Sequence, residues 1–415
     1  MKLEAYMKSV CIVFQLLFAV VLQGAYKVNP VRQNLSESIG LDTSHYKKQI
    51  KVKGFPVVAS AKVSDFAMLE AAHLLDKMLG HRSEVLKEMA RNKVRFSIMA
   101  TDEFTTNVPE HAHLKPAIYW DKRARGLGAD PKSKRPCVSC GEENILGLEG
   151  DPYSTESIFI HEFAHAVHIM GMNRLDETFD DRLKKQYNKA TKAGLWKGTY
   201  AASNHHEYFA EGVQSWFDTN RSNDREHGSI DTRKELLQYD PGLCSFIRET
   251  YGSSEWRYVK PSLRKTSPTH LAGYDRTKSP TFAWPEKLIK WHDDFALGKV
   301  SLAPRGSVDA EPLPTGAPGT RKSVSSRKTM PVYFHNVSGR TLVLEWIGFD
   351  GKPLQRSILR HRDHREPMSF VGHLWKLSDE KTGNFLSFYV VQEKPTRITI
   401  RKELVENRMK QKALR

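Results

Sequence analysis

Two short segments carry side chains suited to binding a metal ion. The run HEFAH at 161–165 is an HExxH pattern on an apolar helical repeat, with Ser154 or Thr155 as the expected helix N-cap. Residues four apart share one face of a helix, so His161 and His165 can bind one zinc ion. Glu162 lies beside them to take a proton from water. The alternative is a buried helix whose two histidines are hydrogen-bonded.

The second segment, HHEYFAEGVQSWF at 205–217, places Glu207 and Glu211 one helical turn apart. A catalytic zinc needs a third protein ligand and one open position. One carboxylate can bind the metal while the other accepts the second N–H of a ligand histidine. His205 and His206 are rival ligands. The alternative, a solvated acidic face, fits poorly with the aromatic residues of this segment.

HEFAH followed by Y-x6-ExxxE resembles the zinc metallopeptidases related to anthrax lethal factor and the bacterial Pro-Pro endopeptidases. The resemblance covers the middle of the chain and implies Zn2+ as cofactor. It implies one role for each matching residue: zinc ligands His161, His165 and Glu207, general base Glu162, transition-state stabiliser Tyr200, and Glu211 behind a ligand histidine. A phenol O–H aimed at a developing oxyanion supplies the charge stabilisation that peptide hydrolysis needs. An ordinary packed tyrosine is the alternative for Tyr200.

Residues 1–25 have a basic start and an apolar run from Val10 to Leu22, which is typical of a secretory signal peptide. The run is short for a membrane span, which needs about 20 apolar residues. We expect a secreted, extracellular protein without stable membrane insertion; a retained signal anchor is the alternative. Sequons at Asn34, Asn220 and Asn336 are compatible with secretion.

The chain has 415 residues, enough for two or three domains, and a net charge of +16 from 64 basic and 48 acidic residues. A basic surface can bind nucleic acid, membranes or anionic matrix. The sequence has no nucleic-acid motif, so we expect no nucleic-acid partner. Retention on anionic matrix is the simpler interpretation for a secreted protein, and solubility alone is the alternative.

Three cysteines remain after the predicted signal peptide. Cys137 and Cys140 have the spacing of a metal knuckle, but no second pair completes four ligands. In an oxidising compartment, a disulfide joining Cys244 to one of the two is expected. Buried, unpaired cysteines are the alternative.

The expected scaffold of the metallopeptidase domain spans 63–260, after a polar N-terminal segment at 26–62 with strand character at 49–52. Apolar residues at helical spacing predict helices up to Gly80 and over 83–91. Residues 94–99 alternate like a strand, and we hypothesise that this strand is the sheet edge to which an extended substrate adds.

A further helical pattern at 231–251, broken at Asp240 and Pro241, closes the predicted domain. Residues 261–302 form an extension of uncertain packing. Residues 303–330 are rich in Pro, Gly, Ser and basic residues and have linker composition. The last residues, 401–415, are predicted as a charged tail.

Residues 331–400 change to short β-rich runs separated by turn residues, which predicts a small β-sandwich. The runs W-x-x-F-D-G-x-P at 346–353 and S-F-V-G-H-L-W at 369–375 resemble the β domain of the von Hippel–Lindau tumour suppressor. In that family the sandwich recognises hydroxyproline in an extended peptide. The resemblance implies peptide-binding roles for four residues: Ser369, His373, Trp375 and, in the supporting pocket, Trp346. Simple packing of a sandwich core is the alternative.

Two positions depart from the second family, because Phe370 stands where the family has Tyr and the expected pocket Tyr falls on Arg356. General peptide binding and a structural sandwich therefore stay open. The predicted fold class is α+β, a zincin-like metallopeptidase domain with a separate C-terminal all-β sandwich. The predicted function is zinc-dependent endopeptidase action on protein or peptide substrates, with hydroxyproline-containing matrix proteins as implied partners. A non-catalytic extracellular peptide- or matrix-binding protein with a relic peptidase domain is the alternative.

Overall fold

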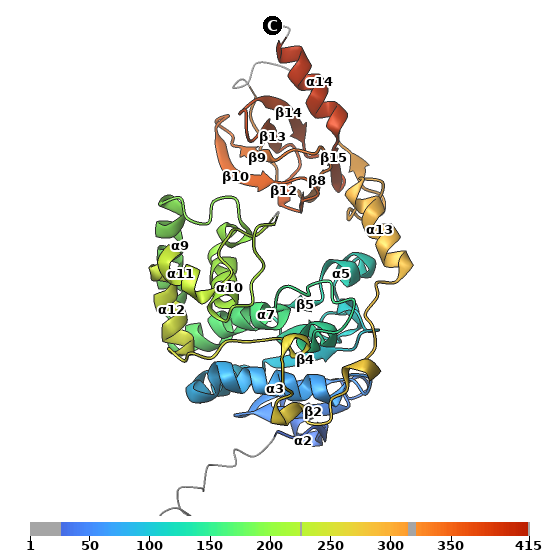
Figure 1. Cartoon of the computed structure of the whole chain (residues 1–415). Coiled ribbons are helices and arrows are strands. Elements are labelled where there is room, and N and C mark those ends of the chain that lie inside the picture. The colour runs from blue at the N-terminus through green and yellow to red at the C-terminus, as the bar shows by residue number, and fades with distance from the viewer. Residues whose placement is uncertain (1–25, 225, 314–320, 414–415) are drawn as a thin grey trace, which may run out of the picture. The chain divides into compact units, whose positions relative to one another are not determined.

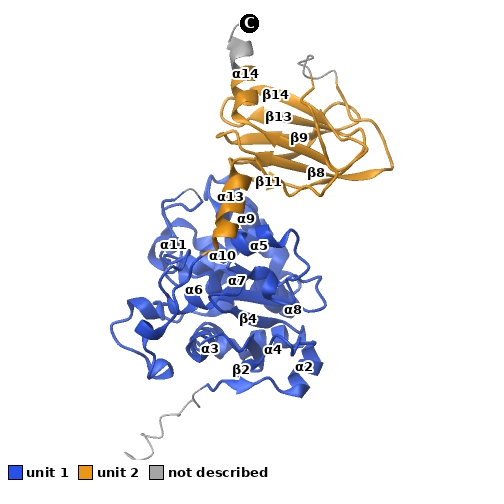
Figure 2. Ribbon diagram, turned by 90° about the vertical axis from the view of Figure 1, so that its right-hand side faces the viewer, with its two compact units in different colours: residues 1–283 blue, residues 284–415 orange. Residues whose placement is uncertain are grey.

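The computed structural model describes residues 26–224, 226–313 and 321–413, and these form two compact units (Figures 1 and 2). Unit 1 ends at Ala283 and unit 2 begins at Trp284. The predicted signal peptide at 1–25 lies outside the described residues. Within the described ranges, no helix is both long and apolar enough to cross a bilayer.

Unit 1 is a mixed α/β structure around a six-stranded sheet in the order β1-β2-β3-β4-β6-β5. The strands are β1 (Asn29–Pro30), β2 (Lys48–Val52), β3 (Phe55–Ala59), β4 (Arg95–Met99), β5 (Gly126–Leu127) and β6 (Cys137–Gly141). Strands β3, β4 and β6 run parallel, and the others pair antiparallel. All residues of these three parallel strands are buried, as is typical of a parallel sheet covered on both faces.

The strand predicted at 94–99 is confirmed as β4, but the hypothesis that it forms the substrate edge is wrong. Both sides of β4 are hydrogen-bonded, to β3 and to β6, so no third chain can add there. Strand β5 is the edge of the sheet beyond β6. Residues 26–62, expected as a separate N-terminal segment, carry β1, β2 and β3 and so form half of this sheet.

Helices surround this sheet in the blue-to-yellow part of Figure 1. Those of unit 1 are α2 (Gln33–Ile39), α3 (Asp65–Leu79), α4 (Ser83–Arg91), α5 (Ala117–Arg123), α6 (Glu142–Leu146), α7 (Ile158–Ala166), α8 (Asn173–Leu175), α9 (Phe179–Lys192), α10 (His205–Trp216), α11 (Arg233–Tyr239) and α12 (Pro241–Tyr251). α3 and α4 confirm the helices predicted before and after Gly80. The predicted break is also confirmed, because Asp240 caps α12 by accepting from the backbone N–H of Leu243 at 2.9 Å.

The HExxH segment forms α7, whose N-cap is Ser157 and neither Ser154 nor Thr155. The Ser157 hydroxyl accepts from the backbone N–H of Ile160 at 3.3 Å. A π-helix, η3 (Val167–Met172), follows α7 directly. Helix α10 packs on α7 and begins after Asn204, whose side chain accepts from the backbone N–H of His206 and of Glu207. This cap fixes the start of the helix that carries Glu207.

The predicted disulfide is wrong, because Cys137, Cys140 and Cys244 are all free and buried. Cys137 and Cys140 are three residues apart on β6, so their side chains point to opposite faces of the sheet. Cys137 packs with Met99 and Val108, apart from the main core that contains Cys140 and Cys244. The three thiols therefore fill core positions on β6 and α12.

Unit 2 is β-rich, as predicted for the C-terminal part, and contains two sheets. One has the order β10-β9-β13-β14, and the other has the order β11-β8-β15-β7, with β12 also paired to β8. The strands are β7 (Val308–Asp309), β8 (Thr329–Asn336), β9 (Leu342–Ile347), β10 (Pro353–Leu359), β11 (His364–Arg365), β12 (Met368–Phe370), β13 (Leu374–Asp379), β14 (Phe385–Val390) and β15 (Thr396–Ile400). Val332, Leu344 and Ile398 from different strands meet in one core.

Unit 2 starts earlier and ends later than the predicted sandwich at 331–400. Helix α13 (Glu286–Ala296) lies in the stretch expected as an extension, and β7 lies in the expected linker at 303–330. β7 pairs with β15, and Ala310 joins the core, so this part of the linker assignment is wrong; residues 314–320 lie outside the described chain. The expected tail carries α14 (Lys402–Ala413), which buries Val405 against the same core.

Candidate metal centre

His161 and His165 on α7 and Glu207 on α10 bring three ligand atoms together in unit 1. The Nε2 atoms of the two histidines lie 3.2 Å apart, and each lies 3.2 Å from Oε2 of Glu207. A tetrahedral zinc ion with bonds of about 2.0–2.1 Å holds its ligand atoms about 3.3 Å apart. The three atoms therefore form a triangle with the dimensions of one face of a zinc tetrahedron. We call these three residues the first cluster.

Carboxylates make the first cluster favourable for a cation. Burial lowers the pKa of His161, but the Glu207 hydrogen bond and the charges of Glu162, Glu207 and Glu211 outweigh burial and raise this pKa to about 10. Burial raises the pKa of Glu207, yet its contacts with His161 and His165 lower it well below the usual range. Without a metal ion, these groups hold a proton. A divalent metal ion would be attracted by the same carboxylate charges.

Gln214 supports His161 from the side of the ring that faces away from the first cluster. Its Oε1 lies 2.8 Å from Nδ1 of His161, and its Nε2 donates to the carbonyl of Ser157 at 3.1 Å. Sequence reasoning missed Gln214 and assigned this position to Glu211, whose Oε1 is farther away, at 3.5 Å from the same nitrogen. The signal was available, because Gln214 follows Glu207 by seven residues and so lies on the same face of α10.

Glu211 lies between His161 of the first cluster and a further histidine, His227. Oε2 of Glu211 lies 3.5 Å from Nε2 of His227 and accepts from the side-chain amide of Asn220 at 3.2 Å. The pKa of His227 is raised to about 9, because Glu211 and Asp224 outweigh the effect of burial. Glu211 therefore lies behind His161 as expected, but it shares that role with Gln214.

Asn220 is buried and its amide is hydrogen-bonded, as is that of Asn336 in unit 2. Neither sequon can carry a glycan in the folded protein, because the amide nitrogen that would be modified is enclosed. Asn34 is exposed. Of the three sequons, Asn34 alone is open to modification in the folded protein.

Strand β5 crosses α7 at very short range beside Glu162. A Cβ on Gly126 would come within 2.5 Å of Ile158 and 3.1 Å of Cγ of Glu162. A Cβ on Gly128 would lie 3.1 Å from Cβ of His165 and 3.4 Å from Oε2 of Glu162. The glycines allow the backbone at and just after this edge strand to approach Glu162 and His165. The sequence alone assigned these glycines no role in the site.

Tyr200 lies in the short helix η4 (Tyr200–Ala202), and its ring is 6.4 Å from that of His161 between centroids. Burial, followed by the charge of Glu207, raises the pKa of the phenol well above its usual range; Arg123 opposes this and Glu162 adds to it. The phenol is therefore protonated at neutral pH and able to donate a hydrogen bond. The backbone N–H of Tyr200 donates to the carbonyl of Glu226 at 2.6 Å, which anchors this turn.

His205 and His206, the rival ligands, do not belong to the first cluster. Nε2 of His205 lies 2.9 Å from Oδ1 of Asp180, and Nδ1 of His206 lies 3.4 Å from Nδ1 of His168. Both side chains thus point away from the first cluster, toward Asp180 and His168. Among the residues that the structure describes, Glu207 completes the triangle with the two HExxH histidines.

The four residues singled out in unit 2 also meet. The Ser369 hydroxyl lies 3.2 Å from Nδ1 of His373 and accepts from Nε1 of Trp375 at 3.3 Å. The Trp346 ring stacks on the His373 ring with centroids 4.9 Å apart and an interplanar angle of 22°. Phe349, which is 48% exposed, packs edge-on against His373. The arrangement is an aromatic surface beside a buried Ser–His pair.

Ser323 fixes this surface from the segment that was expected to be linker. Its hydroxyl donates to the carbonyl of Ile347 and accepts from Nε1 of Trp346 at 3.2 Å and from the N–H of Leu374 at 2.9 Å. Sequence composition gave no signal for this role, because one serine in a Pro- and Ser-rich stretch is not distinctive.

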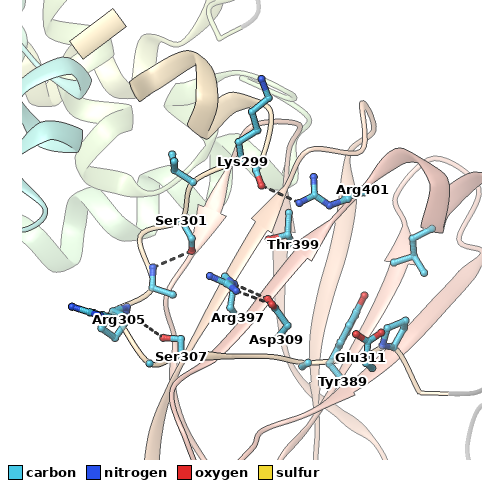
Figure 3. A pocket seen from close by; sticks show the side chains of 18 of the residues that line it. Lys299, Ser301, Arg305, Ser307, Asp309, Glu311, Tyr389, Arg397, Thr399 and Arg401 are labelled. Atoms are coloured by element: carbon cyan, nitrogen blue, oxygen red, sulfur yellow. Dashed lines mark hydrogen bonds and ion pairs between the residues drawn. The ribbon is translucent and has the colours of Figure 1, made fainter. Parts of the chain in front are cut away.

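Unit 2 also has a pocket of about 740 Å3, whose lining is mostly polar (Figure 3). Arg397 in its wall forms a paired contact with Asp309, with distances of 2.6 and 2.7 Å. Arg401 donates to the carbonyls of Leu297 and Gly298. The guanidinium groups of Arg397 and Arg401 are thus engaged by the protein itself, and the pocket holds none of the predicted site residues.

Comparison with known proteins gives a partial match. A family model, the VHL beta domain, matches residues 321–393, which include Ser323 and all four singled-out residues of unit 2. The resemblance stated for the C-terminal part is therefore confirmed, and it begins ten residues before the predicted boundary of 331. No curated protein matches the chain.

Proposed function

We propose that the chain is a secreted zinc-dependent metalloendopeptidase in which unit 1 is a zincin-like catalytic domain. The observation that carries this proposal is the triangle of His161, His165 and Glu207, whose ligand atoms are separated by 3.2 Å. Two imidazoles and one carboxylate are a ligand set of catalytic zinc, which leaves one position for water or substrate. Secretion is supported by the sequence of residues 1–25, and a signal-anchored form is the alternative.

Zinc held there would supply Lewis-acid polarisation of a scissile carbonyl and a more acidic water. Glu162 takes the proton of the attacking water and passes it to the leaving amine. Tyr200 donates its phenol proton in a hydrogen bond to the developing oxyanion. Gln214 accepts from Nδ1 of His161, so that Nε2 of this ring keeps its lone pair for the metal.

The substrate is an extended peptide that adds to the outer edge of β5. Two observations support this position. β5 lies at the end of the sheet order, and a Cβ on Gly128 would come within 3.4 Å of Oε2 of Glu162. A peptide hydrogen-bonded to an edge strand gains main-chain affinity and presents alternate side chains to pockets. Its scissile bond would then lie over Glu162 and the first cluster.

Unit 2 is proposed as a peptide-binding module that tethers the enzyme to proline-rich or hydroxyproline-containing matrix proteins. The match to the VHL beta domain and the exposed Phe349 beside Trp346 and His373 support it. A tether raises the local concentration of substrate. The competing function is a non-catalytic extracellular binding protein, in which unit 2 binds the ligand and unit 1 is a relic. The undisturbed spacing of the first cluster favours the enzyme.

Peptide-library cleavage tests the proposal directly. The recombinant chain should cleave peptides, and Glu162→Gln, which keeps the size of the side chain, should bind zinc equally but lose nearly all turnover. A zinc chelator should abolish wild-type cleavage, and added zinc should restore it. Zinc bound at the first cluster without cleavage would favour the binding protein.

A further inference from the structure

A second group of metal-binding side chains lies beside the first cluster in unit 1. It consists of His168 on the π-helix η3, Asp180 on α9 and His206 at the start of α10. One potential ligand atom from each of the three residues lies within 4.8 Å of the other two. We call this group the second cluster. The proposed catalytic function makes no use of it.

His168 is fully buried, and its Nε2 contacts a carboxylate on α9. Oδ1 of Asp180 lies 2.9 Å from this nitrogen. The same oxygen is contacted by Nε2 of His205 at 2.9 Å. With its Nε2–H facing this carboxylate, His168 keeps Nδ1 as the nitrogen that can bind a metal ion.

This second nitrogen faces another imidazole. Nδ1 of His168 lies 3.4 Å from Nδ1 of His206. Two imidazole nitrogens that face each other need a proton or a cation between them, because otherwise two lone pairs are opposed. The separation is close to the value of about 3.3 Å expected for two nitrogens on one tetrahedral zinc ion.

We propose that the second cluster binds one divalent transition-metal ion, of which zinc is the natural example. Nitrogen ligands from His168 and His206 favour a borderline ion such as Zn2+ or Co2+ over Ca2+ and Mg2+, which prefer oxygen ligands. The carboxylate of Asp180 supplies the third ligand. Its side chain is 34% exposed, so the ion has a path from solvent and an open side for water.

This second ion would have a structural role because of where it lies. His168 follows the first-cluster ligand His165 by three residues, and His206 directly precedes Glu207. An ion shared by η3, α9 and α10 therefore ties together the two segments that carry the first-cluster ligands. π-helical segments inside helices are frequent at functional sites. Here the π-helix η3 places His168 against α9 and α10.

Zinc stoichiometry of the full chain tests this inference. After dialysis against zinc-free buffer, elemental analysis should give two tightly bound equivalents per wild-type chain and one in His206→Asn and in Asp180→Asn. His113→Asn, which replaces an exposed histidine of the same unit, should keep two. His206 and Asp180 are chosen because both are partly exposed and their replacement leaves the core intact, whereas His168 is buried.

A first-cluster variant separates this inference from the proposed function. His165→Asn should lose one equivalent and keep the second, and the double variant His165→Asn/His206→Asn should bind none. If His206→Asn and Asp180→Asn bind as much zinc as the wild type, the second site does not exist, whatever the first cluster does. If zinc disappears in His206→Asn but is unchanged in His165→Asn, the second site stands and the proposed catalytic centre fails.

The stability of the His165→Asn chain gives a readout without activity. Added zinc should raise its thermal unfolding temperature, since an ion that binds only the folded state stabilises it. The same addition should leave the double variant unchanged. An equal shift in both variants would overturn the assignment of this ion to the second cluster.

Discussion

Oε1 of Gln214 lies 2.8 Å from Nδ1 of His161, while Nε2 of the same ring lies 3.2 Å from Oε2 of Glu207. The amide of Gln214 thus holds one nitrogen of the His161 ring, and the other nitrogen faces Glu207. Gln214 is itself fixed, because its Nε2 donates to the carbonyl of Ser157, the residue that caps α7. The cap of α7 and the His161 ring are therefore linked through one side chain.

Gln214→Leu should weaken zinc binding at the first cluster by about 10- to 100-fold, the usual effect of removing the outer partner of a ligand histidine. The variant keeps the volume of the side chain but lets the His161 ring rotate and change tautomer. Competition with a fluorescent zinc chelator measures the change. Gln355→Leu, at an exposed position of unit 2, is the matched control. Unchanged affinity in Gln214→Leu would show that Glu211 alone orients the ring.

Gly126→Ala should lower the free energy of unfolding by about 1–3 kcal/mol, the typical result of overpacking. Its Cβ would meet Cγ2 of Ile158 at 2.5 Å and the backbone carbonyl oxygen of Ser139 at 2.8 Å, and backbone cannot yield easily. Gly128→Ala should cost less, since its nearest contact is 3.1 Å. Urea denaturation of both variants gives the comparison. Equal stability of Gly126→Ala and wild type would mean that β5 is not packed closely on α7.

Local patterns predicted much of unit 1, whereas long-range packing determined the rest. The spacing of His161 and His165 and the helices around Gly80 are visible in sequence because they repeat every three to four residues. The interior place of β4 and the edge place of β5 depend on strand order, which a single strand does not encode. Gln214 and Ser323 act through partners 53 and 24 residues away. Their types are too common to be noticed without the fold.

His335 in unit 2 makes stability depend on pH. Its ring is 4% exposed, stacks on Phe295 at 4.1 Å between centroids, and neither ring nitrogen has a hydrogen-bond partner in the described structure. Burial lowers its pKa to about 4, and the charges of His364, Arg401 and His361 act in the same direction. The unfolded chain binds this proton at its ordinary pKa of about 6.5.

The folded state therefore binds fewer protons than the unfolded state between pH 6.5 and 4. The contribution of neutral His335 is complete above pH 6.5 and is lost as the pH falls, by up to about 3 kcal/mol. His335→Phe, which has no proton to bind, should remove this part of the pH dependence. Calorimetry at pH 7 and pH 4.5 tests it. The same loss of stability in the variant would assign the pH dependence to other groups.

The aromatic surface of unit 2 should distinguish hydroxyproline from proline. Ser369 and His373 are 3% and 6% exposed, and Nδ1 of His373 is occupied by the Ser369 hydroxyl. His373 is enclosed by Trp346 and Phe349, so a proline ring has aromatic faces on which to pack, and a ligand hydroxyl has the buried pair as its polar partner. A site that hydrogen-bonds a hydroxyl disfavours a ligand without one.

The full chain carrying Glu162→Gln, which is expected not to cleave peptides, should therefore bind a hydroxyproline peptide about tenfold more tightly than its proline counterpart, as expected for one hydrogen bond of about 1.4 kcal/mol. His373→Phe should keep the stacking and abolish the difference. Ser323→Ala should weaken both peptides alike, because Trp346 loses the partner of its Nε1. Equal binding of the two peptides by the parent chain would leave a general proline-rich site, in which the aromatic rings contribute the affinity and the Ser369–His373 pair serves packing. No binding of either peptide would reduce the surface to a structural role.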